Sequence, residues 1–454
     1  MQHALQSLVG SVSSFTQAFG ALLDASVLAQ LWQQQGPKPR GHKPGLSGPQ
    51  LVSALVFHVL AGAGTLAAHV QQLTGLKLSD SALSQRRTAA GVGVFEAIIQ
   101  AALRPLAVWK EHPQAFYHGW RLVGMDGSQC SVSNRPQLLG RLRKAASRRL
   151  RAAFAKVPMS WLMELGTHAP LAAVVGTEQE SEWELSHRLL SQLQSGWLVL
   201  ADRLYGVSAF VNELFIATQR MGSHFLVRVR QNVKVSVRQV LSDGSALVAV
   251  AVADPWHPHR KHGCIWVREI VGRVRRANGS WVSVRLWTDL WDERQHPAAA
   301  LLALYAQRWE IELGTREWKL DLRGGVLLQS HTVETAAQEI LAAVLAMAVL
   351  SQARLAAAAR GEVGPLRISF GQTLLLVRSL WWLVAVGQGI LSARQVLALT
   401  ERTIAWIAAQ ALPKRRPRSC PRAVRQPVGR WPRLVANSYQ HGSVQYEVLH
   451  IAPV

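Results

Sequence analysis

The clearest chemical pattern in the sequence consists of four polar residues, Tyr305, Arg308, Glu312 and Lys319. They lie at relative positions 0, 3, 7 and 14, and at about 100° per helical residue they fall within an arc of about 60°. One helix face would therefore present an aromatic ring, a guanidinium, a carboxylate and an ammonium group. This combination suits a phosphate backbone, with one carboxylate left to hold a metal ion. The alternative is an ordinary solvated face, stabilised by opposite charges one turn apart.

Two aspartates upstream each follow a short apolar run. Asp126 ends the segment that begins at Arg121, and Asp202 follows the run Trp197–Ala201. A continuous apolar run is typical of a strand buried on both faces, so each acid is predicted at the C-terminal end of a strand. Asp126 is followed by Gly127, and an Asp-Gly pair taken alone more often marks a turn.

The spacing Tyr-x2-Arg-x3-Glu-x6-Lys resembles the signature of the cut-and-paste branch of bacterial insertion-sequence DDE transposases. A second similar stretch is Leu-Ser-Asp-Ser-Ala-Leu-Ser-Gln-Arg-Arg, which ends at Arg87. The resemblance covers most of residues 50–435. Leu204 stands where the family commonly has a glycine, and His331 stands where a basic residue is common. The three acids are intact.

The resemblance implies that Asp126, Asp202 and Glu312 form a catalytic triad on a ribonuclease-H-like fold. Two Mg²⁺ ions would be held there, with Asp126 bridging both, and Mn²⁺ is expected to substitute. Arg308 and Lys319 would clamp DNA phosphates, and Tyr305 would stack or hydrogen-bond near a flipped base or a terminal phosphate.

The activity implied by the resemblance is cleavage of transposon ends, hairpin formation and resolution, and strand transfer into target DNA, by a dimer bound to double-stranded DNA. Two alternatives stay open. One is a DNA-binding derivative of a transposase that has lost catalysis, and the other is a ribonuclease-H-fold nuclease without strand transfer.

The charge of the chain points to a polyanionic partner. The 454 residues include 50 Lys and Arg against 27 Asp and Glu, a formal charge of +23. Nucleic acid is the expected partner, and an anionic membrane surface is the competitor.

The three cysteines predict no disulfide framework, which suits a reducing cytoplasm. The resemblance implies a bacterial cytoplasm, with the protein associated with the nucleoid. The longest apolar runs are short or interrupted by Arg378 and predict buried helices without a membrane span.

The N-terminal segment, residues 1–115, is predicted to be a helical DNA-binding domain. A helix over Thr65–Leu73, a turn, and a helix that starts at Ser79 or Asp80 resemble a helix-turn-helix. Arg86 and Arg87, near the end of the second helix, would contact DNA. A plain helical hairpin is the alternative.

The remaining chain predicts an α/β fold in which a ribonuclease-H-like core is interrupted. Residues 116–223 would form its first part, with strands over Ser160–His168 and Leu171–Val175 and another from Val132. Residues 224–296 alternate apolar and polar and predict a β-rich insertion. The second part, residues 297–360, carries Glu312.

The C-terminal segment, residues 361–454, is predicted to be helical and then a basic tail. Its stretch Pro413–Arg433 has eight basic residues, five prolines and no acid, which suits an arm that binds DNA without sequence specificity. In the insertion, four residues of metal-ligating types lie close together in the sequence, but their spacing matches no standard zinc pattern, and solvated histidines are the simpler interpretation. They are His257, His259, His262 and Cys264.

Overall fold

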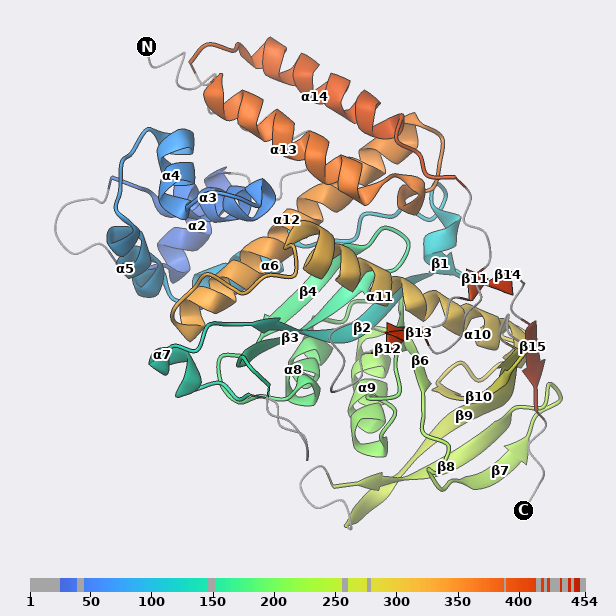
Figure 1. Cartoon of the computed structure of the whole chain (residues 1–454). Helices are drawn as coiled ribbons and strands as arrows, with labels where there is room; N and C mark the ends of the chain where they lie inside the picture. Colours follow the sequence, from blue (N-terminus) through green and yellow to red (C-terminus); the bar gives the residue numbers. More distant parts are fainter. Residues whose placement is uncertain are drawn as a thin grey trace. The chain divides into compact units, whose positions relative to one another are not determined.

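A computed structural model describes most of the chain (Figure 1). The chain divides into two compact units. Unit 1 combines Met1–Gln192 with Trp309–Leu412, and unit 2 combines Leu193–Arg308 with Pro413–Val454. Each unit is described by itself. The described residues are 25–38, 45–144, 152–254, 260–275, 279–387, 389–413, 418–419, 423–424, 433–434, 440–441 and 445–449.

Unit 1 is built around the helix α12, Val333–Arg360, which is apolar on nearly every side. Its most apolar window has a mean hydropathy of 1.9, high enough to cross a membrane by length and composition, but 83% of that window is buried inside the protein. A helix that is hydrophobic all round needs neighbours on every side. These are α3 (Gly48–Ala61), α6 (Gly93–Ala102), α13 (Phe370–Val386) and α14 (Ala393–Ala408), which pack against α12.

This packing explains why the units do not follow the five segments predicted from the sequence. The N-terminal helices and the C-terminal helices both cover α12, so they join one unit with the strands of the first part of the core. α2, Ala25–Gln35, packs on α3 and α6.

The predicted pair of short N-terminal helices is confirmed. α4 spans Leu66–Thr74 and begins after the N-cap Thr65. Gly75, with φ of 73°, ends it in the left-handed region that favours glycine. α5 spans Asp80–Ala90, and the hydroxyl of its N-cap Ser79 accepts the backbone N–H of Ala82.

The strands of unit 1 form an antiparallel sheet in the order β4-β3-β2. β2 spans Trp120–Ser131, β3 Lys156–Glu164 and β4 Ala169–Val175, and the short β1, Phe116–Tyr117, pairs with β2. α8, Glu182–Leu189, packs against the same three strands, β2, β3 and β4.

Two sequence predictions about these strands were wrong. The strand expected from Val132 is absent from the described residues, where the chain instead forms the short helix α7, Pro136–Leu139. β2 does not stop at Asp126 but continues for five more residues. The reason is that residues 127–131 stay paired with residues 156–160 of β3, and Ser128 and Cys130 are buried in this pairing while Gln129 is exposed.

Unit 2 contains a mixed sheet in the order β5-β6-β10-β9-β8-β7. β5 and β6 are parallel and are joined by α9, and the other pairs are antiparallel. This confirms a β-rich segment within residues 224–296. The elements are β5 (Trp197–Ala201), α9 (Ser208–Met221), β6 (His224–Arg228), β7 (Ser236–Val240), β8 (Ala246–Ala253), β9 (Lys261–Arg275) and β10 (Trp281–Thr288).

The C-terminal tail adds one more strand to this sheet. β15, Gln445–Val448, pairs with β9. Two short pairs, β11 (Arg418–Ser419) with β14 (Gln440–His441) and β12 (Ala423–Val424) with β13 (Arg433–Leu434), are also described. The rest of the predicted basic arm lies outside the described residues.

Candidate active site

Asp126 lies in the middle of β2 with its side chain partly buried. Its Oδ1 accepts the backbone N–H of Gly127 at 2.9 Å, and the hydroxyl of Ser160 donates to its carbonyl at 3.2 Å. A Cβ atom at Gly127 would clash with the carboxylate of Glu182 on α8. Glycine at this position therefore allows α8 to approach the strand that carries Asp126.

Glu312 lies on α11, Trp309–Arg316, which packs against β2. A Cβ atom at Gly124 would lie 2.9 Å from the Cβ of Ile311, so the strand and the helix touch next to Glu312. Gly124 and Asp126 share one face of β2 because side chains alternate along a strand. The structure thus brings Asp126 and Glu312 onto neighbouring, directly packed elements of unit 1.

Cationic side chains lie farther along the same face of β2. Nη1 of Arg323 donates to Sγ of the buried Cys130 at 2.9 Å. Burial raises the pKa of the Cys130 thiol, and the positive charges of Arg323 and Lys319 act on it in the opposite direction. Lys319 is therefore close to β2, beyond Asp126 along the strand.

The signature residues do not share one regular α-helix, which corrects the sequence prediction. α10, Ala298–Tyr305, is followed by a 3-10 turn over Ala306–Arg308, then by α11, and then by a π-helical turn over Glu317–Leu322. A 3-10 turn advances faster around the axis than an α-helix and a π turn advances more slowly, so the predicted arc fails. Changes of this kind inside a helix are frequent at functional sites.

Asp202, Tyr305 and Arg308 lie in unit 2. Asp202 directly follows β5, as predicted, and its Oδ1 accepts the backbone N–H of Leu204 at 2.5 Å. The hydroxyl of Tyr305 donates to the carbonyl of Ala201, the residue before Asp202, at 3.1 Å. The guanidinium of Arg308 lies 5.9 Å from the ring centroid of Tyr305. The first two signature residues therefore adjoin the end of β5.

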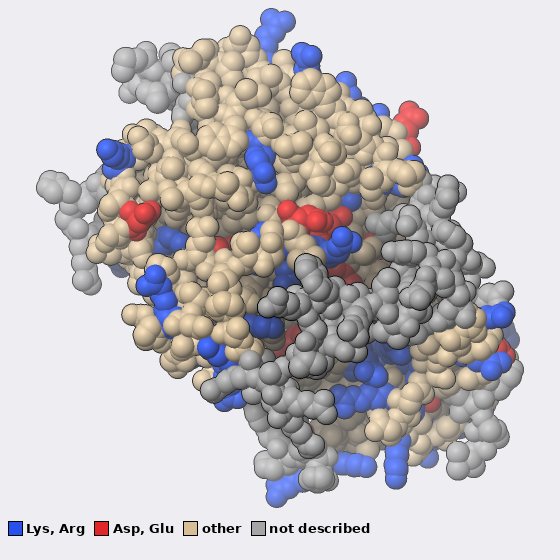
Figure 2. All heavy atoms as spheres, viewed as in Figure 1, with Lys and Arg blue, Asp and Glu red and all other residues tan. Residues whose placement is uncertain are grey.

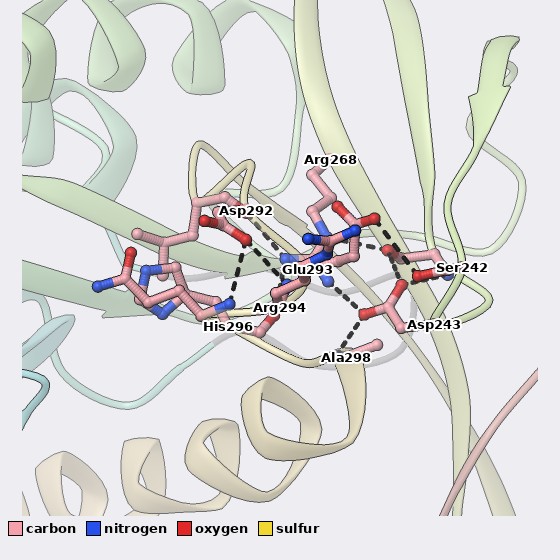
Figure 3. Close-up of polar contacts among 11 residues, drawn as sticks. Ser242, Asp243, Arg268, Asp292, Glu293, Arg294, His296 and Ala298 are labelled. Carbon is pink, nitrogen blue, oxygen red and sulfur yellow. Dashed lines mark hydrogen bonds and ion pairs between the residues drawn. The ribbon is translucent and has the colours of Figure 1, made fainter.

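The start of α10 is held by a polar network in unit 2 that is centred on the buried Arg268 (Figure 3). Asp243, in the turn between β7 and β8, accepts the backbone N–H of Ala298 at 2.7 Å and forms an ion pair with Arg268. Arg268 is fully buried and also donates to the carbonyls of Leu290 at 3.0 Å and His296 at 2.7 Å. Burial opposes ionisation of Asp243, but hydrogen bonds donated by the hydroxyl and backbone N–H of Ser245 and by the Ala298 N–H, together with the Arg268 charge, hold its pKa below the usual range.

Arg87 has an internal role, which corrects its predicted place on DNA. Its Nη2 donates to the hydroxyl of Ser330 at 3.0 Å and to the carbonyl of Thr335 at 2.6 Å. The amide of Gln338 donates back to the carbonyl of Arg87 at 2.7 Å. Arg87 thus ties α5 to the start of α12. Arg86 is partly buried, and its Nε has no hydrogen-bond partner among the described residues.

Sequence reasoning missed a group of charged residues on another side of α11. His168, in the turn between β3 and β4, contacts Glu310 and Glu317, and Glu317 also pairs with Arg354 of α12. The sequence signal that could have indicated this group is the seven-residue spacing of Glu310 and Glu317, which places both acids on one helix face.

The three predicted metal ligands are all carboxylates, the donor type that suits Mg²⁺. Asp126 and Glu312 fit this purpose, because both are partly buried on packed elements of unit 1, and Asp202 belongs to unit 2. Among the described residues, no group of three or more His, Cys, Asp or Glu side chains is gathered closely enough to hold a metal ion. His257, His259 and the side chain of His262 lie outside the described part, and Cys264 on β9 is exposed.

The surface agrees with the basic composition. On the face drawn in Figure 2, Lys and Arg side chains are visibly more numerous than Asp and Glu side chains. The whole chain carries a formal charge of +23. This excess favours a polyanionic partner.

Comparison with known proteins gives consistent matches. Residues 155–349 match the family described as the transposase DDE domain, a range that includes Asp202 and Glu312. The chain is 25% identical over 360 residues to the transposase InsG for insertion sequence element IS4 of Escherichia coli (strain K12), covering 78% of each chain. It is 24% identical over 159 residues to the putative transposase InsZ of the same organism, covering 34% of this chain and 52% of that one.

Among solved structures, a piggyBac transposase synaptic complex with hairpin DNA matches with a TM-score of 0.45 and 8% identity, over 88% of this chain and 85% of that chain. The sequence matches carry the assignment. The chain therefore carries a transposase DDE domain over residues 155–349, and over most of its length it is similar to an insertion-sequence transposase.

Proposed function

We propose that the protein is the transposase of an insertion sequence, which cleaves the terminal inverted repeats of its element and joins them to target DNA. The observation that carries this proposal is the packing of α11 on β2, which places Glu312 beside the strand of Asp126, in a chain with a transposase DDE domain. Asp202, at the end of β5, would complete the triad when DNA and metal are bound.

Asp126, Asp202 and Glu312 would hold two Mg²⁺ ions, or Mn²⁺ in their place. The chemistry that the bound ions supply is activation of the attacking oxygen and neutralisation of charge on the leaving oxygen. Arg308 and Lys319 would bind the phosphates beside the scissile bond, because both side chains carry the charge that phosphate recognition needs.

Double-stranded DNA is the proposed partner. The segment 1–115, with α4 and α5, would bind the transposon ends, and Arg86 is the basic side chain of α5 that we retain for this contact.

The proposed core has the ribonuclease-H-like order of strands and is formed by residues 116–223 and 297–360. Residues 224–296 would be an insertion in this core. Residues 361–454 would add helices and the basic tail. A homodimer would pair two ends in the bacterial cytoplasm. The Tyr-Arg-Glu-Lys signature supports a hairpin intermediate.

A cleavage assay tests the proposal. The full chain is incubated with a duplex that carries the inverted repeat flanking its coding region, first in Ca²⁺ to measure binding and then in Mg²⁺ to measure cleavage. Glu312→Gln and Asp126→Asn should bind the duplex and fail to cleave it. Glu401→Gln, an exposed acid on α14, is the matched control for the change in charge and should cleave normally.

The products separate the alternatives. Cleaved ends joined to a second DNA support a transposase, and cleaved ends that are never joined support a nuclease. Binding without cleavage by the unaltered chain would identify a DNA-binding derivative. Cleavage by Glu312→Gln at the unaltered rate would refute the assignment of the triad.

A further inference from the structure

We propose that His168 is a positioning residue that holds Glu312 in place for metal binding, by gripping its helix on either side of that acid. The proposal rests on the proposed function, because it assumes that Glu312 binds the metal. It concerns a contact that the four-residue signature does not contain.

The grip consists of two hydrogen bonds from one buried ring. Nδ1 of His168 lies 2.7 Å from Oε2 of Glu317, and Nε2 lies 3.1 Å from Oε2 of Glu310. The His168 side chain is fully buried, while the Glu310 and Glu317 side chains are 20% and 15% exposed. Two acids of one helix are therefore joined to a single point of the β3–β4 turn.

The chemistry of the ring sets its charge. An ionised carboxylate only accepts hydrogen bonds, and a neutral imidazole has one N–H to donate. Contact with a carboxylate at each nitrogen is satisfied when both nitrogens carry hydrogen, as in the imidazolium. Burial works against this charge, but the hydrogen bonds that the ring donates to Glu310 and Glu317 outweigh it and raise the pKa of His168.

The position of His168 is fixed by contacts on its other sides. The hydroxyl of Ser351, on α12, donates to the His168 carbonyl at 3.1 Å. The backbone N–H of His168 donates to the carbonyl of Glu164 at 2.9 Å, and the Glu164 side chain forms a buried ion pair with Arg121 of β2. The φ angle of His168 is 58°, in the left-handed region, which non-glycine residues adopt only when the surroundings hold them there.

The helix is also fixed where it meets the turn. A Cβ atom at Gly314 would clash with Met163 and would lie 3.2 Å from Cγ of His168. Glu317 has a second cationic partner, because Nη1 of the buried Arg354 donates to it at 3.0 Å. Arg354 in turn donates to the carbonyl of Ile368 at 3.1 Å. The π-helical turn that continues α11 is therefore tied at Glu317 to α12 and, through Arg354, to the segment that follows α12.

The residues that contact His168 lie on one side of the helix, and Glu312, the proposed metal ligand, lies on the other side. Glu310, Gly314 and Glu317 fall on one helix face, and Glu312 lies about 200° around the axis from Glu310 at about 100° per residue. His168 therefore acts through the helix. Rotation or sliding of α11 would move the Glu312 carboxylate relative to Asp126, and the grip prevents both movements.

The test measures metal binding directly. His168→Asn keeps a residue that tolerates the left-handed conformation but removes the charge and one of the two donors. In the full chain bound to its terminal-repeat duplex, Mn²⁺ binding is followed by the electron paramagnetic resonance signal of free Mn²⁺. We expect the Mn²⁺ dissociation constant and the Mg²⁺ concentration for half-maximal cleavage to rise about 10–100-fold, as for other residues that orient metal ligands. Affinity for the duplex should not change.

A second variant and a control sharpen the result. Glu310→Gln removes one carboxylate from a partly exposed position and should shift the metal midpoint in the same direction, and it decides the question if His168→Asn does not fold. His224→Asn is the matched control, because Nδ1 of His224 likewise contacts a carboxylate, that of the buried Asp289 at 3.0 Å, and both residues belong to unit 2. It should leave the metal midpoint unchanged.

Unchanged Mn²⁺ binding in both His168→Asn and Glu310→Gln would overturn the proposal, and so would an equal shift in His224→Asn. These failures differ from failure of the proposed function. That failure would appear as no Mn²⁺ binding and no Mg²⁺-dependent cleavage by the unaltered chain.

Discussion

At the scale of single residues, the signature tyrosine makes a specific internal contact. The Tyr305 hydroxyl donates to the carbonyl of Ala201, so it holds the end of β5 directly before Asp202. Its ring lies beside the Arg308 guanidinium. The hydroxyl and the ring therefore serve different purposes, and a substitution can separate them.

Tyr305→Phe keeps the ring and removes the hydroxyl. We expect the cleavage rate to fall about five-fold, since a hydrogen bond of this kind contributes about 1 kcal/mol. Affinity for the terminal-repeat duplex should stay the same. Single-turnover cleavage and equilibrium binding measure the two effects. Loss of DNA affinity with an unchanged cleavage rate would instead assign the hydroxyl to a DNA contact.

Arg86 and Arg87 are neighbours in the sequence with opposite expected roles. Arg87→Gln should destabilise unit 1 by about 1–2 kcal/mol, because the Gln cannot replace its hydrogen bonds to Ser330 and Thr335. Arg86→Gln should leave stability nearly unchanged and should lower the salt slope of DNA binding by about one unit. Urea unfolding and salt titrations measure these effects. An unchanged urea midpoint for Arg87→Gln would contradict the internal role.

At the scale of elements, two separate anchors hold the helices that carry the signature. In unit 2, Asp243 accepts the first backbone N–H of α10, the helix that ends at Tyr305. In unit 1, His168 grips α11 on either side of Glu312. An acid at a helix N-terminus is favourable because the unpaired N–H groups there carry partial positive charge.

Asp243→Asn should loosen α10. Loss of the carboxylate leaves the buried Arg268 without its charged partner, a change that typically costs about 3–5 kcal/mol. Hydrogen exchange of the α10 amides should become faster, and Glu401→Gln, the same kind of change at an exposed acid on α14, serves as the control. Unchanged exchange in Asp243→Asn would show that the carboxylate does not hold the helix.

The same anchor predicts a pH dependence. The folded pKa of Asp243 is below its unfolded value, so its stabilisation is present above the unfolded pKa and is lost as the pH falls through the folded pKa. The difference in α10 exchange between the unaltered chain and Asp243→Asn should therefore shrink in acid. A constant difference down to the acid limit would contradict the ionised form.

At the scale of the whole molecule, the net charge favours a polyanionic partner. A formal charge of +23 gives strong attraction to any polyanion, and α12, the helix apolar enough to span a membrane, is mostly enclosed by its neighbours. DNA and an anionic membrane surface would both attract this charge. DNA releases condensed counterions when its phosphates are neutralised, which gives its binding a steep dependence on salt.

Affinity for duplex DNA without the terminal repeat should fall steeply with salt. With six to ten phosphate contacts, the loss between 50 and 200 mM salt is about 10³–10⁵-fold. Fluorescence anisotropy measures this slope, and flotation with phosphatidylserine vesicles at the same ionic strength measures the competing interaction. Tighter binding to the vesicles than to the duplex would favour the membrane surface.

The sequence by itself determined which residues are worth testing and most of the elements that carry them. Ser79 was recognisable, with Asp80, as a candidate helix N-cap, and the apolar run before Asp202 was recognisable as a strand, because capping and hydrophobic periodicity are local properties. The transposase DDE domain was likewise predicted from spacing and resemblance, and the family match supports it.

Only the tertiary structure decided how far β2 continues past Asp126, where the signature helix changes its winding, and that Arg87 faces the protein interior. Each depends on contacts between residues far apart in the chain, such as Gly124 with Ile311 or Arg87 with Ser330. The His168 grip is of the same kind, since a turn and a helix about 140 residues apart must meet before its charge has a partner. Local periodicity carries no information about such meetings, because they are set by the packing of the whole core.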